Sequence, residues 1–120
     1  MKKILLTCAL LFTLGSIVMA INLKPKADYS DANLVNGKER FIKNCVSCHG
    51  ALGQGDGIDG LDLNEKPANI NRKLNSFFTP QSRLINDVLN GEREMPAWKG
   101  ILSESDITDI FAYVLEINRE

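Results

Sequence analysis

The sequence predicts an all-α fold with three main helices, which together with their connecting loops surround one site. Three stretches carry apolar residues at three- and four-residue steps, the spacing of one buried helix face. No stretch alternates apolar and polar residues over enough positions to predict a β-strand. The chain has 120 residues and begins with a separate apolar leader, so we expect a single small domain.

The leader, residues 1–20, has the pattern of a secretory signal peptide. Lys2 and Lys3 precede an apolar run, and Val18-Met19-Ala20 offers small or modest residues where a signal peptidase reads the chain, which predicts cleavage after Ala20. An uncleaved anchor is the alternative, since the run just reaches the length needed to span a bilayer. In both cases Lys2 and Lys3 stay on the cytoplasmic side of the membrane and the chain after the leader is exported. We therefore expect a periplasmic protein, released there or anchored to the outer face of the inner membrane.

Without the leader the chain keeps 12 basic and 15 acidic residues, a net charge of −3. No basic stripe is evident, which argues against nucleic acid as a partner. The remaining 100 residues are near the lower limit for a sufficient apolar core, so a large apolar cofactor would add what the chain lacks.

The elements are predicted in chain order. Residues 21–30 form a linker, and the domain, residues 31–120, opens with a helix from a cap at Ser30 or Asp31 to Asn44. A second helix begins at Thr79-Pro80 and ends at Asn90-Gly91. The last begins at the capping-box-like Ser103-Glu104-Ser105-Asp106 and ends near Asn118.

Residues 50–66 contain five glycines and predict an extended loop. Gly55 to Gly60 formally matches the dinucleotide-binding pattern, but no strand precedes it and no βαβ unit surrounds it. The acidic residues of this loop have the wrong intervals for an EF-hand, and only a loose calcium site stays open as an alternative.

The most specific motif is Cys45-Val46-Ser47-Cys48-His49. Two cysteines three positions apart, followed at once by histidine, are typical of a c-type haem attachment site. The thiols can form thioethers with one porphyrin, and the imidazole can then bind the iron. A thioredoxin-like pair would need a preceding strand, and a zinc site would need ligands that the chain lacks.

His49 is the only histidine, so two histidines of one chain cannot ligate the same iron. Met95, in Glu94-Met95-Pro96-Ala97-Trp98, is the only methionine outside the leader, and it lies in a predicted loop rather than on a core stripe. It is therefore the candidate for the second axial ligand, with core packing as the alternative.

With these motifs the chain resembles the monohaem class I cytochromes c over nearly its whole length beyond the leader. The resemblance rests on Phe41 to Gly50, Gly53 to Gly57, Lys66 to Ile70, Gly91 to Gly100 and the last helix. It implies one covalent haem c on Cys45 and Cys48, with His49 and Met95 as axial ligands. It also implies a crossing of the first and last helices, where Gly37 and Phe41 meet Ile110 and Tyr113. Pro67 would offer its backbone carbonyl to the imidazole of His49.

The implied activity is one-electron transfer between redox protein partners that the sequence does not identify, without catalysis. Trp98 would either hold a haem propionate or simply pack against the haem. One alternative is a membrane-tethered haem subunit or relay domain of a respiratory or oxidoreductase complex. Another is a haem enzyme with a labile sixth ligand, which the lack of a second histidine disfavours.

Overall fold

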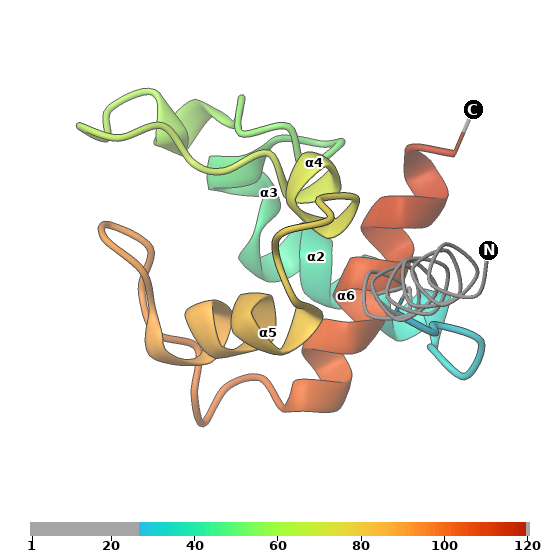
Figure 1. Ribbon diagram of the computed structural model, residues 1–120. Helices are drawn as coiled ribbons and strands as arrows, with labels where there is room; N and C mark the ends of the chain where they lie inside the picture. The colour runs from blue at the N-terminus through green and yellow to red at the C-terminus, as the bar shows by residue number, and fades with distance from the viewer. Residues whose placement is uncertain (1–26, 120) are drawn as a thin grey trace, which may run out of the picture.

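Figure 1 shows the computed structural model, which describes residues 27–119. The predicted leader and most of the predicted linker lie outside the described residues. Within residues 27–119 the chain forms helices and two isolated bridges, Glu92–Met95 and Lys99–Leu102, but no strand. The predicted all-α fold is confirmed. In this part of the chain no helix has the length and apolar character needed to cross a membrane.

The described helices are α2 (Leu34–Asn44), α3 (Val46–His49), η1 (Ile58–Gly60), α4 (Ile70–Leu74), α5 (Gln81–Asn90) and α6 (Glu104–Ile117). The three predicted main helices are α2, α5 and α6. The predicted start of α2 was wrong, because Asn33 caps it instead of Ser30 or Asp31: its side chain accepts hydrogen bonds from the backbone of Val35 and Asn36. Helices α3 and α4 are too short to give a periodic signal in the sequence.

Helices α2 and α6 cross at close range. A Cβ atom at Gly37 would overlap the backbone carbonyl of Asp109, so only glycine allows this approach. One turn later the ring of Phe41, fully buried, lies 5.8 Å from that of Tyr113, centroid to centroid. The crossing that the family resemblance implies is therefore present, with Asp109 rather than Ile110 as the backbone that meets Gly37.

Most of the buried core comes from α6. Ile107 and Val114 are fully buried with Phe41, and the remaining buried apolar side chains are Leu102, Ile110, Phe111 and Ala112. The predicted capping box at the start of α6 is confirmed, because Asp106 accepts from the backbone N–H of Ser103 at 2.9 Å and its own N–H donates to Ser103 Oγ at 3.1 Å.

A polar network also joins α2 to α6. The buried carboxylate of Asp109 accepts hydrogen bonds from the backbone N–H of Asn33 at 2.8 Å and from Nδ2 of Asn36 at 2.7 Å. The same Asn36 amide donates to Asp106 at 3.0 Å. This bond, with those from Ser103, lowers the pKa of Asp106 from 3.8 to about 2.

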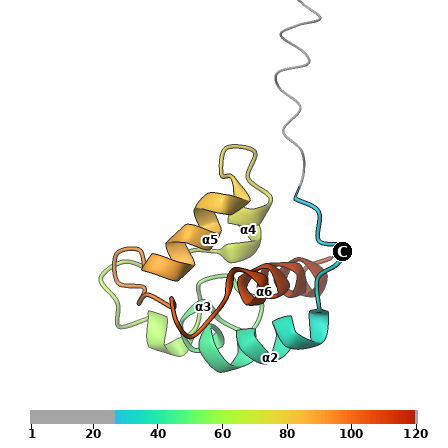
Figure 2. The ribbon, with the colours of Figure 1, turned by 90° about the horizontal axis from the view of Figure 1, so that it is seen from below.

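The other half of the molecule is built differently. In Figure 2, α4 and α5 lie on one side and α2 and α3 on the other, with α6 between α2 and α4. Helix α5 has no buried residue; its apolar side chains, at positions 84, 85, 88 and 89, are half-buried and pack against the core from one side. The predicted apolar stripe of α5 is present, and it packs against the core cluster.

Candidate functional site

The two cysteines of the motif lie at the junction of α2 and α3. Cys45 ends α2, with its N–H bonded to the carbonyl of Phe41 at 2.9 Å, and its own carbonyl accepts from the N–H of His49 at 2.8 Å. Cys45 and Cys48 are both half-buried, and no disulfide joins them. Burial, reinforced by the neighbouring Cys48, raises the pKa of the Cys45 thiol to about 12. The helical turn places both sulfur atoms and the imidazole on one short element, as the motif predicts.

The imidazole of His49 is oriented by a backbone carbonyl. Its Nδ1 lies 2.9 Å from the carbonyl oxygen of Ala68, which can only accept, so Nδ1 carries the proton and Nε2 keeps its lone pair. Burial lowers the pKa of His49, and this hydrogen bond partly opposes the shift. The neutral imidazole with a defined tautomer is the form that binds a metal ion.

The prediction that Pro67 supplies this carbonyl was wrong by one residue. The carbonyl of Pro67 faces Gly55, where a Cβ atom would overlap it. The chain alternates its carbonyl directions in this extended stretch, so the next one, at Ala68, points to His49. Pro67 itself packs its ring against Gly60, beside the backbone of Cys48.

The glycine-rich loop wraps the short helix α3, a role that the sequence analysis missed. The N–H of Gly57 donates to the carbonyl of Cys48 at 3.1 Å, and the N–H of Gly55 donates to that of His49 at 2.8 Å. A Cβ atom at Gly57 or Gly60 would collide with the backbone of α3. The glycines therefore let the loop lie directly on α3 and satisfy its last carbonyls.

Met95 lies in a tight loop that folds back on the end of α5. Gly91, at φ +78°, ends the helix, and Arg93 adopts φ +57°, so that Met95 N–H reaches the carbonyl of Glu92 at 3.0 Å. A Cβ atom at Gly91 would lie 2.7 Å from the carbonyl of Met95. Beyond it, the N–H of Trp98 donates to the carbonyl of Val88 at 3.1 Å. Met95 is half-buried in a loop that α5 holds in place.

A second set of contacts joins the Met95 loop to the end of the glycine-rich loop. Nδ2 of Asn64 donates to one oxygen of Glu94 at 2.7 Å, and the N–H of Glu65 donates to the other at 3.3 Å. Arg93 forms an ion pair with Glu65. We call these four residues the loop clamp. The residues of the loop clamp are polar and about 30 positions apart, so no periodic pattern in the sequence could predict it. The two hydrogen bonds that Glu94 accepts lower the pKa of its carboxyl group.

The predicted donor set fits a covalently attached haem. Cys45 and Cys48 provide thiols on one turn, His49 presents Nε2, and the only thioether of the described residues lies in the opposite loop. In Figure 1 α3 lies above and α5 below, on separate sides of the molecule. Trp98 is half-buried and packs against the core. Residues 27–119 hold no group of three or more His, Cys, Asp or Glu side chains suited to a metal ion, so the loose calcium alternative finds no such group there.

Comparison with known proteins agrees with this reading. The family model described as "Cytochrome C oxidase, cbb3-type, subunit III" matches residues 32–114. The chain is 31% identical to cytochrome c6 of Thermosynechococcus vestitus over 116 residues, which cover 96% of this chain and 91% of the relative. It is 30% identical to cytochrome c6 of Synechocystis sp. over 107 residues, 88% of this chain and 74% of the relative.

A further relative is a cytochrome c6 of Chlorolobion braunii, which is 34% identical over 86 residues, 72% of this chain and 92% of the relative. The matched residues include the attachment motif, the carbonyl that orients His49, the Met95 loop and most of α6. The family match, the helical fold and the chemistry of the donor set lead to one conclusion: the chain belongs to the small monohaem class I c-type cytochromes.

Proposed function

We propose that this protein is an exported one-electron carrier that works in the periplasm. Its single haem c would be attached through Cys45 and Cys48, with His49 and Met95 as axial ligands. Membership of the c-type cytochromes supports electron transfer with redox protein partners. The leader pattern of residues 1–20 supports export.

The observation that carries the proposal is the hydrogen bond from His49 Nδ1 to the carbonyl of Ala68 at 2.9 Å. It fixes the tautomer and the ring orientation, so that Nε2 is committed to a ligand. When bound, the haem supplies a metal that gains or loses a single electron. The thioether of Met95, a soft ligand, favours the reduced state and raises the midpoint potential relative to a second imidazole.

Filling the sixth position with Met95 also explains why the protein would carry electrons without catalysis. The chain offers no second histidine, and a small molecule would have to displace the thioether before reaching the metal. The loop clamp and the bonds from residues 98 and 99 to the end of α5 hold the Met95 loop in place.

A second candidate is a haem subunit that stays tethered to a membrane complex. The family model that matches the chain is described as an oxidase subunit, and the uncleaved reading of the leader would supply the tether. The intact mass of the protein extracted from membranes distinguishes the two: residues 21–120 plus one haem for a released carrier, all 120 residues plus one haem for a tethered subunit.

Substitution of the proposed sixth ligand tests the main proposal. We expect Met95→Ala to abolish the sulfur-to-iron charge-transfer band and to lower the midpoint potential, because the soft ligand is lost. The ferrous variant should bind carbon monoxide readily, whereas the parent should not. Pro96→Ala, which keeps the thioether, is the matched control. An unchanged spectrum in Met95→Ala would reject this ligand.

A further inference from the structure

The turn between α4 and α5 carries two exposed aromatic side chains. Phe78 is 90% exposed and Phe77 is 55% exposed, and their rings meet edge to face at 5.4 Å. In Figure 2 this turn projects at the edge of the molecule farthest from α2. Exposing two adjacent phenylalanine side chains to water at a projecting turn is unfavourable in free energy, and such apolar surface often marks a binding site.

The same segment has the opposite charge to the rest of the domain. Residues 66–86 contain four basic residues and no acidic one, whereas the remaining described residues contain six basic and 14 acidic ones. Arg72 and Lys73, at the end of α4, are exposed and form no ion pair within residues 27–119. We call Arg72, Lys73, Phe77 and Phe78 the basic aromatic tip.

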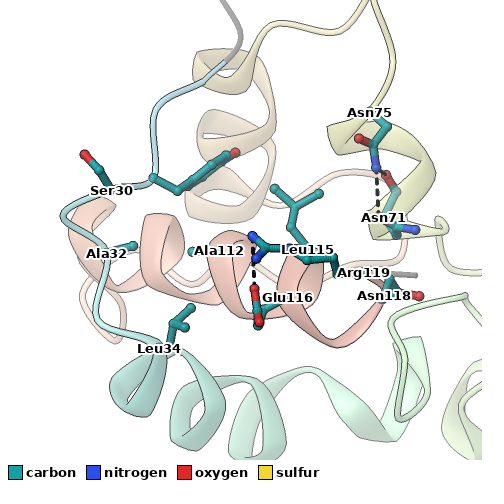
Figure 3. Close-up of a pocket in the computed structure, with 11 residues that line it drawn as sticks. Ser30, Ala32, Leu34, Asn71, Asn75, Ala112, Leu115, Glu116, Asn118 and Arg119 are labelled. Atoms are coloured by element: carbon teal, nitrogen blue, oxygen red, sulfur yellow. Dashed lines mark hydrogen bonds and ion pairs between the residues drawn. The ribbon is translucent and has the colours of Figure 1, made fainter.

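The described chain also enters the domain on this side. Figure 3 shows a pocket of about 430 Å³ with Ser30 of the N-terminal segment on one side and Asn71 and Asn75 of α4 on the other. Tyr29 also lines it. The described chain therefore begins on the side of the domain that carries α4.

We propose that the basic aromatic tip docks the protein on an anionic phospholipid surface. Phenylalanines that enter the interface, flanked by cations that meet lipid phosphates, are the chemistry by which proteins lie on such membranes. The acidic remainder of the domain would be repelled from the same surface, which fixes the orientation. An acidic protein is the competing partner, but a projecting turn fits a deformable interface better than a preformed surface.

This orientation leaves the proposed redox site free. The tip precedes α5, and Met95 follows its other end, about 15 Å away along a ten-residue helix. A protein bound through the tip could therefore exchange electrons with a partner at Met95 and α3 while it stays on the membrane.

The test uses the holo-protein as the cell exports it, with the N-terminus that it carries. Vesicles of phosphatidylcholine alone are compared with vesicles of phosphatidylcholine and phosphatidylglycerol at low and high salt. Hydrogen exchange of residues 75–80 is the main readout, because a tether through the leader would not by itself protect this turn. Flotation with the vesicles gives the affinity of a protein whose leader has been removed.

We expect protection of residues 75–80 only with the anionic vesicles, and its loss at high salt. The double variant Phe77→Ser with Phe78→Ser should bind the anionic vesicles at least roughly tenfold more weakly in flotation. The double variant Arg72→Gln with Lys73→Gln should lose roughly fivefold in affinity for each cation removed. The matched controls are Val35→Ser, and Lys38→Gln with Lys43→Gln, all exposed on α2; they should bind like the parent.

The proposal would be overturned if residues 75–80 were protected equally by both kinds of vesicle, or by neither. It would also be overturned if the α2 control variants lost as much vesicle affinity as the variants of the basic aromatic tip. Protection of residues 75–80 by an acidic redox protein without lipid would overturn it as well. All variants should keep the haem spectrum and midpoint potential of the parent. A colourless protein that still binds anionic vesicles would contradict the proposed function and leave the docking surface intact, so the two failures are distinguishable.

Discussion

The crossing of α2 and α6 and the half of the molecule formed by α5 and the Met95 loop are held together in different ways. The crossing buries Phe41, Ile107 and Val114 completely and adds the buried hydrogen bonds of Asp109. Helix α5 has no buried residue, and the Met95 loop depends on backbone bonds and exposed polar contacts. We therefore expect the α5 half to depend more strongly on the proposed haem than the crossing does.

The largest effect on this difference is expected when haem attachment is prevented. We expect Cys45→Ala with Cys48→Ala to give a colourless chain whose residues 81–99 lose most of their protection from hydrogen exchange. The contact region of α2 and α6 should keep measurably more protection, although the whole domain is destabilised. Uniform loss over both halves would show that the crossing depends on haem as strongly as α5 does.

The next test opens the crossing itself. Gly37→Ala places a methyl group against the carbonyl of Asp109, where the backbone cannot yield without separating the helices. We expect a loss of about 2–3 kcal/mol in the free energy of unfolding of the holo-protein, measured with denaturant. Lys38→Ala, at the adjacent exposed position of α2, should change it by less than about 0.5 kcal/mol. Comparable effects of both substitutions would contradict the close approach.

A smaller effect should follow from the polar network, with a defined pH dependence. Asp106→Ala removes the acceptor for Asn36 and for the capping box, and should cost about 1–2 kcal/mol near pH 7. Because folding lowers the pKa of Asp106 from 3.8 to about 2, the parent has this stabilisation in full above pH 3.8. The difference between parent and variant should shrink as the pH falls from 3.8 to about 2. A difference that stays constant over this range would place the stabilisation elsewhere.

The smallest change in stability is expected at the loop clamp, but with a functional consequence. Glu94→Ala removes the acceptor for Asn64 and Glu65 and should change the free energy of unfolding little, because the contacts are exposed. Added imidazole should nevertheless displace Met95 a few times faster, as followed by loss of the charge-transfer band in stopped flow. Glu92→Ala, whose side chain lies outside the clamp, is the control. Equal rates in parent and Glu94→Ala would show that the clamp does not restrain Met95.

The sequence predicted what depends on local spacing. The three main helices follow from apolar periodicity, and the capping box of α6 follows from Ser103 and Asp106. The start of α2 was misplaced because Ser30 and Asp31 are equally good caps in isolation. The cap lies instead at Asn33, where the bond from Asn33 N–H to Asp109, 76 positions away, helps to hold the start of the helix.

The site shows the same division. Cys45, Cys48 and His49 are placed by one local motif, and the structure puts them on one turn. The carbonyl at Ala68 instead of Pro67, the glycines that lie on α3, and the loop clamp all depend on segments that meet only in the folded chain. The spacing of residues along the chain does not determine such tertiary contacts to within one residue. A shift of one residue, from Pro67 to Ala68, changes which backbone carbonyl points to His49.

The partner of the His49 imidazole has a consequence for how such a protein can be adjusted. Since the acceptor belongs to the main chain, replacing the methyl side chain of Ala68 leaves the acceptor atom in the molecule. Insertions or deletions between positions 50 and 67 would instead move that oxygen, and with it the strength with which the ring would donate electrons to the proposed haem iron. We therefore expect a change in loop length, rather than in residue type at position 68, to retune the midpoint potential of the proposed haem.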